Sequence, residues 1–491
     1  MLNTILLSIT EKCDFNCKHC RLVKYQTEVS FDKALKIIKK IKGQVKGVNL
    51  TGGEPLLYPK IIPLVAYIKR NTDLRLTMST NGHLLTPQIA RQLKKIGLDG
   101  INISMDSTDI KKHDWFRGYQ GAYEAAEKGI KLAIKQGLNC RIASSLGKFN
   151  YREVNKLIIK AIDLRCSAIS FRRILPVSKA LDSLTSQLLN KRELFYSLKQ
   201  IYQYLYFLYP YFNIFVQEPM DLYFSQNILS KKFGPSGGCG ACRKMLEIKT
   251  NGDIWPCPSL PIKLGNIFEN SLSDILDHKE ARLLINQEFK GVCGCCDLKP
   301  VCGGCRAWAL YKKHDYLAAD PYCLRNNYQA MVKDLPSLQE KDSLTRVEVS
   351  SIVSLTTKFM KPILEKSGIV WRRELLEQDL KNNRQGRFWL LKLKSRIIGY
   401  LYFIEKDKEI YLRSIIIDRP WQGKKFGFLL MKRLELLAAK KRMRTIKLTI
   451  QEANHEAMTF YKRLNYMMVG EEKGKGFAMV KNLEKYSSNA K

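Results

Sequence analysis

Residues 3 to 215 alternate short apolar segments with amphipathic segments of helical periodicity, which restricts the fold more than any other feature of this sequence. The apolar segments run directly into polar loops: VNLTGGEP, LRLTMSTNG, GINISMDS, LNCRIASSL and AISFRRILP. Between them lie segments typical of helices: FDKALKIIKKIKG, PQIARQLKKIG and YEAAEKGIKLAIKQG. Strand–helix alternation at this spacing predicts a parallel sheet, either open or closed into a barrel. Because chemistry in such barrels lies at the carboxyl ends of the strands, the polar residues that follow these segments are candidate site residues.

The length of 491 residues predicts two to four domains, since domains typically have about 100 to 200 residues. No apolar run reaches the roughly 18 residues of a membrane span. The first segment, MLNTILLSITEKC, lacks the basic leader and cleavage site of a signal peptide and is typical of a buried strand. We therefore expect a cytoplasmic protein without a membrane partner. Cys140 and Cys166 stand alone among apolar residues and are expected in the core.

The net charge of +37 comes from 83 Lys and Arg against 46 Asp and Glu. This excess suits nucleic acid, an acidic peptide or an anionic cofactor, and equally a lysine-rich solvated surface. Charge alone does not decide between these, but no arginine-rich block or RNA-binding motif accompanies it. We do not expect nucleic acid to be a partner.

A loop of three cysteines, Cys13, Cys17 and Cys20, follows the first apolar segment with the spacing CxxxCxxC. In a long chain without an export signal, clustered cysteines indicate metal ligands and not disulfides. A four-iron cluster takes one thiolate per iron, so three cysteines leave one iron open for another ligand. The alternative is a zinc knuckle, for which the loop itself offers only His19 as a fourth ligand.

The spacing CxxxCxxC resembles the radical S-adenosylmethionine (SAM) superfamily. In that family SAM chelates the open iron through its amino and carboxylate groups, and its cleavage yields a 5′-deoxyadenosyl radical that abstracts hydrogen from the substrate. The position of His19 is usually aromatic there and lies against the adenine. The stretch TGGEP is similar to the family's GGEP loop, which implies that Gly52 and Gly53 let the backbone approach the SAM amino group and that Glu54 accepts its hydrogen bond.

Further positions in STNG, ISMDS and HDWFRGYQGAYEAA also resemble the family. The strand-end residues match contacts to the ribose and methionine parts of SAM, and the arginine matches a contact to its carboxylate. Ser, Thr, Asn and Asp at strand ends are equally typical of turns and caps, so both readings stay open. The residues that the resemblance assigns here are Ser79, Thr80, Asn81, Ser104, Asp106 and Arg117.

A second group of nine cysteines lies between residues 239 and 323. The segment LEIKTNGDIWPC alternates around an Asn-Gly turn, which predicts a hairpin that brings Cys242 and Cys257 together. The whole pattern resembles the SPASM extension of radical SAM enzymes that mature peptides and build redox cofactors. It departs from that pattern by one residue, since the last internal gap is two residues long in CGGC. The run CGGCRAWAL…DYLAADPYC is similar to members of pyrroloquinoline quinone, mycofactocin and heme pathways.

The SPASM resemblance implies two auxiliary four-iron clusters that accept electrons, so that the reaction ends in oxidation. The spare Cys295 and the shortened gap leave individual partners open. A zinc ribbon is the alternative, but it would not explain the coupling to a radical SAM barrel. The implied ligands are Cys239, Cys242, Cys257 and Cys305 for one cluster, and Cys293, Cys296, Cys302 and Cys323 for the other.

A third pattern begins after a polar stretch at 336–345 that is typical of a linker. Two helical stretches, three alternating strands and a loop that opens a helix follow, and a helix N-terminus offers free N–H groups to phosphate. The stretch IIIDRPWQGKKFGFLLMKRL resembles the loop with which GCN5-related (GNAT) acyltransferases hold the coenzyme A pyrophosphate, except that Lys425 replaces its first glycine. We expect the loop amides to remain available provided that φ at this position stays negative. The loop residues implied are Gln422, Gly423, Lys424, Lys425, Phe426 and Gly427.

The later stretch TIKLTIQEANHEAMTFYKRLNYMMVG matches the closing strand and helix of the GNAT fold. In that resemblance Asn454 matches the motif asparagine, and Tyr461 stands where an acid protonates the departing coenzyme A thiolate. The alternative for Tyr461 is an aromatic ring packed on the sheet.

Together these features predict an α/β protein: a partial (β/α)6-type radical SAM barrel over 1–215, a cysteine-rich SPASM domain over 235–335 and an α/β GNAT fold over 346–485. We expect an enzyme that uses three [4Fe-4S] clusters, SAM and acetyl-CoA. It would oxidatively modify a peptide or peptide-derived cofactor and acylate an amine, with electrons from a reductant such as flavodoxin or ferredoxin. The alternative substrates are a tetrapyrrole side chain, tRNA or another small molecule. The alternative for the C-terminal domain is a binding module without acyltransferase activity.

Overall fold

The computed structural model describes residues 2–21, 27–219, 238–325, 335–382, 385–472 and 476–483. The chain forms two compact units. Unit 1 comprises Met1–Tyr202 and Asn213–Met331, and unit 2 comprises Gln203–Phe212 and Val332–Lys491. No helix of the described ranges combines the length and the apolar character that crossing a membrane requires.

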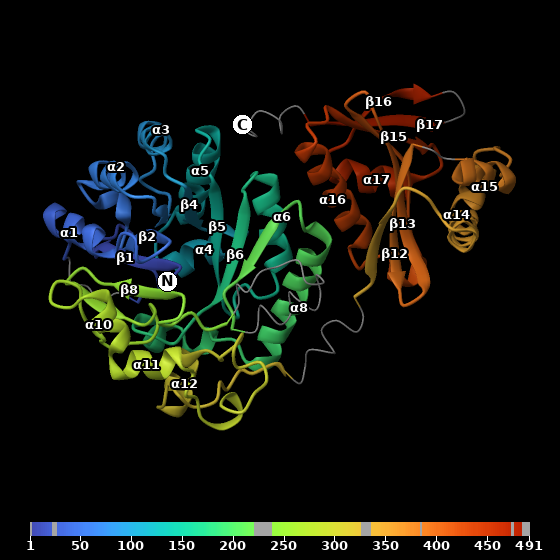
Figure 1. Cartoon of the computed structure of the whole chain (residues 1–491). Helices are drawn as coiled ribbons and strands as arrows, with labels where there is room; N and C mark the ends of the chain where they lie inside the picture. Colours follow the sequence, from blue (N-terminus) through green and yellow to red (C-terminus); the bar gives the residue numbers. More distant parts are fainter. Residues whose placement is uncertain are drawn as a thin grey trace. The chain divides into compact units, whose positions relative to one another are not determined.

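Unit 1 is built on a sheet whose first seven strands run parallel in sequence order (Figure 1). The expected strands and helices are confirmed, and each strand from β1 to β6 is followed by at least one helix. The strands are β1 (Thr4–Thr10), β2 (Gly47–Gly52), β3 (Arg75–Thr80), β4 (Gly100–Ser104), β5 (Cys140–Leu146), β6 (Ala168–Arg173) and β7 (Asn213–Val216). The helices are α1 (Phe31–Ile41), α2 (Ile61–Asn71), α3 (Pro87–Ile96), α4 (Ile110–Arg117), α5 (Ala122–Lys135), α6 (Val154–Asp163), α7 (Lys179–Ser183) and α8 (Lys191–Leu208), which crosses the unit boundary.

Local signals account for these elements. The β6 strand, AISFRR, is nearly continuous in buried residues, as expected of a parallel strand that is covered on both faces. Helix α3 begins with Pro87 after Thr86, whose side chain accepts a hydrogen bond from the Ile89 N–H, and it ends at Gly97 with φ 94°. Cys140 and Cys166 are 1% and 6% exposed, which confirms that they are core thiols.

The cysteine-rich segment continues the same sheet. Strand β8 (Met245–Ile248) pairs in parallel with β1, from Thr4 opposite Met245 to Leu7 opposite Ile248. Strand β9 (Asp253–Trp255) pairs antiparallel with β8, which confirms the Asn-Gly hairpin, and β10 (Gly265–Asn266) completes the order β10-β9-β8-β1-β2-β3-β4-β5-β6-β7. Within the described residues up to 325, the helices that follow are α10 (Leu272–Asp277), α11 (Lys279–Ile285) and α12 (Arg306–Lys313).

Unit 2 is a second sheet of order β11-β12-β13-β14-β15-β17-β16, with β14 and β15 parallel and the other neighbours antiparallel. Helix α14 packs on it through a core that includes Ile352, Val353, Phe388 and Tyr400. The strands are β11 (Ser337–Lys341), β12 (Gly386–Leu393), β13 (Arg396–Lys406), β14 (Glu409–Ile417), β15 (Thr445–Gln451), β16 (Met467–Glu472) and β17 (Gly476–Asn482). The helices are α14 (Arg346–Lys366), α15 (Arg373–Asn382), α16 (Phe426–Lys440) and α17 (His455–Arg463).

One segment differs from its expected conformation. Residues 337–341, which lie inside the stretch expected as a linker, form the edge strand β11 and pair antiparallel with β12. The sequence SLQEK is mostly polar because only one side of an edge strand meets a neighbouring strand, so its composition resembles that of a loop.

Candidate active site

The CxxxCxxC loop lies directly after β1, at the carboxyl end of the parallel strands. Gly52 and Gly53 hold it closely: the Gly53 N–H donates to the Thr10 carbonyl at 2.7 Å. A Cβ atom at Gly52 would lie 2.2 Å from the Thr10 oxygen, and one at Gly53 would lie 2.1 Å from the Lys12 oxygen. These glycines therefore allow the cysteine loop to approach β2, a structural role that sequence reasoning missed. Their approach to SAM stays a prediction.

The other side of the cysteine loop is held by the segment around α7. The Ser178 hydroxyl donates to the Arg21 carbonyl at 2.8 Å, and the Ser183 hydroxyl donates to the Lys18 carbonyl at 2.9 Å. Within the loop, the Cys13 side chain is exposed and the other two cysteines are half-buried. The three thiols are thus presented by a loop whose backbone is fixed from both sides.

Glu54 joins the ends of β2 and β3 and is only 1% exposed. Its carboxylate accepts hydrogen bonds from the Thr80 hydroxyl at 2.7 Å, the Asn81 N–H at 2.8 Å and the Leu56 N–H at 3.0 Å. Burial raises its pKa to about 7, although these hydrogen bonds favour the ionised form. The buried side chain therefore links the ends of β2 and β3 by hydrogen bonds. Its contact with a SAM amine stays a prediction.

Asp106 and Arg117 form a buried ion pair behind the cysteine loop. Asp106 accepts hydrogen bonds from Arg117 Nε and the Ser145 N–H, both at 2.7 Å, and Arg117 Nη2 lies 2.6 Å from Asp106 Oδ2. Burial alone would raise the pKa of Asp106, but the charge of Arg117, the neighbouring histidines and the Ser145 N–H together outweigh it and lower the pKa. Arg117 Nη1 also lies 3.9 Å from Cys17 Sγ, so a fixed cation stands beside one of the loop thiols.

Four other predicted SAM contacts lie near these groups. The His19 ring stacks on Phe116 with 4.3 Å between centroids, and burial lowers its pKa to about 3, which keeps it neutral near pH 7. Asn81 donates to Asp14 at 2.8 Å, and Ser79 is hydrogen-bonded to an asparagine of β2. Ser104 ends β4 and is half-buried. The structure thus gathers the predicted residues at one end of the sheet, while their contacts with SAM stay predictions.

The first predicted auxiliary ligand set is also brought together. The Cys242 N–H lies 3.3 Å from the Pro256 carbonyl, next to Cys257. Burial and then the neighbouring thiols of Cys257 and Cys239 raise the pKa of Cys242. Burial is the main cause of the raised pKa of Cys305, to which Cys239 also contributes. Cys239 is therefore close to the other three members.

The second predicted set lines one cavity of about 300 Å³: Cys293, Cys296, Cys302 and Cys323. Donors point at these sulfurs, as is typical around iron–sulfur ligands. The Asp320 and Gly304 N–H groups lie 3.4 Å from Cys293 Sγ and Cys302 Sγ. Cys295 is exposed, with its sulfur near the carbonyls of residues 291 and 292.

These thiols fit multi-iron clusters. Their sulfur atoms lie around a cavity and accept hydrogen bonds from backbone N–H groups, an arrangement typical of iron–sulfur cluster ligands. Throughout the described ranges, no three Cys, His, Asp or Glu side chains form a group that could hold one metal ion.

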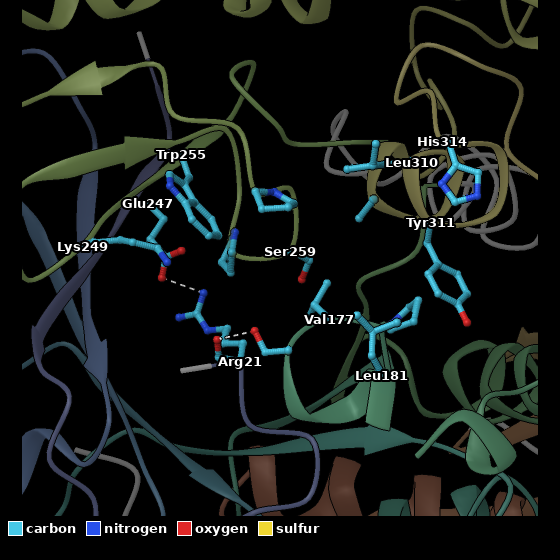
Figure 2. A pocket seen from close by; sticks show the side chains of 15 residues that line it. Arg21, Val177, Leu181, Glu247, Lys249, Trp255, Ser259, Leu310, Tyr311 and His314 are labelled. Carbon is cyan, nitrogen blue, oxygen red and sulfur yellow. Dashed lines mark hydrogen bonds and ion pairs between the residues drawn. The ribbon is translucent and has the colours of Figure 1, made fainter. Parts of the chain in front are cut away.

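A larger cavity of about 480 Å³ lies beside the cysteine loop (Figure 2). Three of its lining residues are close in sequence to predicted cluster ligands. Arg21 follows Cys20, Pro258 follows Cys257, and Ala307 lies two residues after Cys305. Sequence reasoning named none of the lining residues, although their adjacency to the cysteines was a usable signal. A molecule in this cavity would contact residues that follow closely after the CxxxCxxC loop and after two cysteines of the first auxiliary ligand set.

In unit 2 the loop before α16 differs from expectation at Lys425. Its φ is 66°, in the left-handed region that favours glycine, so the condition of a negative φ is not met. The loop takes a backbone conformation suited to glycine, so the backbone of Lys425 is strained. Gln422 donates to the Ile417 carbonyl at 2.8 Å, and a Cβ atom at Gly427 would have its nearest neighbour 3.7 Å away.

The two remaining acyltransferase candidates lie at the start of α17 and within it. Asn454 caps this helix by accepting a hydrogen bond from the Ala457 N–H at 3.1 Å. Tyr461 is 6% exposed, and burial raises the pKa of its hydroxyl. Their roles toward coenzyme A stay predictions.

Comparison with known proteins gives three family matches along the chain. The radical SAM superfamily matches residues 7–160, the iron–sulfur cluster-binding domain SPASM matches residues 239–305, and the acetyltransferase (GNAT) family matches residues 355–466. All three resemblances inferred from the motifs are thereby confirmed.

Individual relatives cover the first two regions. An AdoMet-dependent heme synthase of Methanosarcina barkeri is 30% identical over 338 residues, 65% of this chain and 95% of the relative. The subtilosin biosynthesis protein AlbA of Bacillus subtilis is 26% identical over 313 residues, 59% of this chain and 66% of the relative. The structure of Streptococcus suis SuiB bound to precursor peptide SuiA aligns with a TM-score of 0.55 at 22% identity, covering 66% of this chain and 76% of that one.

Proposed function

This chain belongs to the radical SAM superfamily, and from that premise we propose that it oxidatively modifies a peptide or a peptide-derived cofactor held in the 480 Å³ cavity. The chain is an enzyme that binds iron–sulfur clusters and SAM and carries an acetyltransferase domain. The position of the cavity carries the proposal, because its lining includes residues that closely follow Cys20, Cys257 and Cys305 in the sequence.

When bound, the clusters and SAM supply a 5′-deoxyadenosyl radical and an acceptor for the electron that oxidation releases. The chain's own residues hold and shield these groups. We assign one cluster to the CxxxCxxC loop and two to the SPASM cysteines, three in all. Arg117 keeps a positive charge beside Cys17, and Asp106 keeps that guanidinium oriented. Leu310 and Trp255 help to exclude water from the cavity.

The GNAT domain is proposed to transfer an acetyl group from acetyl-CoA to an amine of the same product or its precursor. The single chain keeps both activities at a high effective concentration.

A second candidate is modification of a tetrapyrrole side chain. It is favoured by the heme synthase of Methanosarcina barkeri, of which this chain covers 95%. The peptide candidate is supported by AlbA and by the SuiB complex, whose names refer to bacteriocin biosynthesis and to a precursor peptide.

The test is a turnover assay on the anaerobically reconstituted full-length protein with SAM and a reductant. Peptides encoded beside the gene and a carboxyethyl-substituted porphyrin are supplied separately, and 5′-deoxyadenosine and product mass are measured. Loss of two hydrogen atoms from a peptide, matched by 5′-deoxyadenosine, would support the first candidate. Loss of a side-chain carboxyl group from the porphyrin, with unchanged peptides, would replace it with the second.

A further inference from the structure

The β8–β9 hairpin places a charged side chain on the wall of the 480 Å³ cavity. Glu247 pairs with Trp255 across the hairpin, and Lys249 follows two residues later, so all three side chains lie on the same face. Figure 2 shows these residues on one side of the cavity, with Leu310 and Tyr311 on the other.

Lys249 is a half-buried cation whose charge no carboxylate balances at close range. Its ammonium nitrogen lies 3.2 Å from the centroid of the Trp255 ring. Among the residues that the structure describes, none forms an ion pair with it within 4.0 Å. Burial lowers its pKa, which reflects the unfavourable desolvation of the ammonium. A bound anion would remove this penalty.

Three carboxylates stand near enough to favour the charged ammonium, those of Glu247, Glu11 and Asp253, but in the described ranges none lies within 4.0 Å of it, and Asp253 pairs with Lys263. Glu247 is 1% exposed, and its Oε1 lies 2.6 Å from Arg21 Nη1 and accepts a hydrogen bond from the Ser8 hydroxyl at 3.3 Å. Arg21 and Glu247 therefore balance each other within the wall. The lining retains one net positive charge, that of Lys249.

The rest of the lining is mostly apolar, including Val177, Leu181 and Leu310. A ligand that fits this wall has an apolar body and one negative charge. A carboxylate has that single charge, whereas a phosphate monoester carries about −1.5 to −2 near pH 7 and would leave an excess of negative charge among apolar groups.

We propose that the cavity selects substrates with a carboxylate on an apolar body and that Lys249 binds this carboxylate. The inference rests on the proposed function, in which this cavity holds the substrate. Lys249 is thus a specificity-determining residue. The pairing forms by ligand binding alone and needs no turnover.

The test uses the full-length reconstituted protein and three small probes: 4-phenylbutyrate, its neutral isostere 4-phenylbutyramide, and phenyl phosphate. Calorimetry measures their dissociation constants with Lys249→Met, which removes the charge and keeps the stem on Trp255, and with Lys249→Arg, which keeps the charge. The matched control is Lys313→Met, on an exposed lysine of α12 outside the cavity lining. Iron content and circular dichroism verify that each variant is folded.

We expect 4-phenylbutyrate to bind about tenfold more tightly than its amide in the wild type, in Lys249→Arg and in Lys313→Met, a difference of about 1.4 kcal/mol. Lys249→Met should bind both probes equally. Equal binding in the wild type, a preference that survives in Lys249→Met, tighter binding of phenyl phosphate, or no binding of the carboxylate at millimolar concentration would each overturn the proposal. Because no probe is turned over, failure here and failure of the turnover assay are separate results.

Discussion

Gly53→Ala tests whether the GGEP glycines position the cysteine loop. The added Cβ would lie 2.1 Å from the Lys12 carbonyl oxygen, and separations below 3.0 Å are essentially never seen for real Cβ atoms. The loop must therefore move by at least 3.0 − 2.1 = 0.9 Å. The clash is with backbone, which a side-chain rotation cannot relieve. Overpacking of this kind destabilises a protein by about 1–3 kcal/mol.

A displacement of about 1 Å at a reacting centre typically lowers rates by about 100-fold. We expect Gly53→Ala to lose about four irons per chain, one cluster, and to form 5′-deoxyadenosine from SAM about 100-fold more slowly. Iron analysis after anaerobic reconstitution and chromatography of 5′-deoxyadenosine measure both effects. The eight auxiliary irons should remain, which separates a local displacement from a failure to fold.

The matched control is Gly100→Ala, at the start of β4, where a Cβ would have its nearest neighbour 3.4 Å away. This variant should keep wild-type iron content and activity. If Gly53→Ala also kept both, the steric account of the GGEP loop would be refuted.

Four further predictions follow from the sites described. Replacing all three cysteines of the CxxxCxxC loop with Ala should remove about four of about twelve irons and abolish 5′-deoxyadenosine formation; about four irons in the intact protein would contradict the SPASM ligand assignment. Binding to tRNA should be weak and vanish near 0.15 M salt, and tight binding measured by filter retention at that salt would favour tRNA modification. The full-length protein should bind acetyl-CoA in calorimetry; Gly427→Trp should block binding, and Tyr461→Phe should slow only acetyl transfer, whereas no heat at millimolar ligand would indicate a degenerate domain. Burial raises the pKa of Glu54 from 4.5 to about 7, so the folded state holds a proton that the unfolded state lacks between these values. The thermal stability of wild-type protein relative to Glu54→Gln should therefore fall as pH rises through this window, and a constant difference would contradict a titrating Glu54.

The sequence by itself determined the elements and the chemical classes of the sites. Apolar periodicity defined the strands and helices of the barrel, and the Asn-Gly turn in TNGDIW defined the β8–β9 hairpin. CxxxCxxC and GGEP were enough to identify the radical SAM superfamily. Such signals lie within short stretches, because backbone preference and turn chemistry depend on neighbouring residues.

Tertiary structure decided what depends on partners far along the chain. Thr4 pairs in parallel with Met245, which joins the cysteine-rich segment to the barrel sheet. No local sequence signal in either segment predicts this pairing. The same holds for β11, whose polar residues were expected in a linker, and for the left-handed φ of Lys425, which the surrounding loop imposes. Lys249 looks like any surface lysine in the sequence. Only the fold places it on a cavity wall where Arg21, more than 200 residues earlier, pairs with the adjacent Glu247, and where no carboxylate of the described residues lies within 4.0 Å of its ammonium.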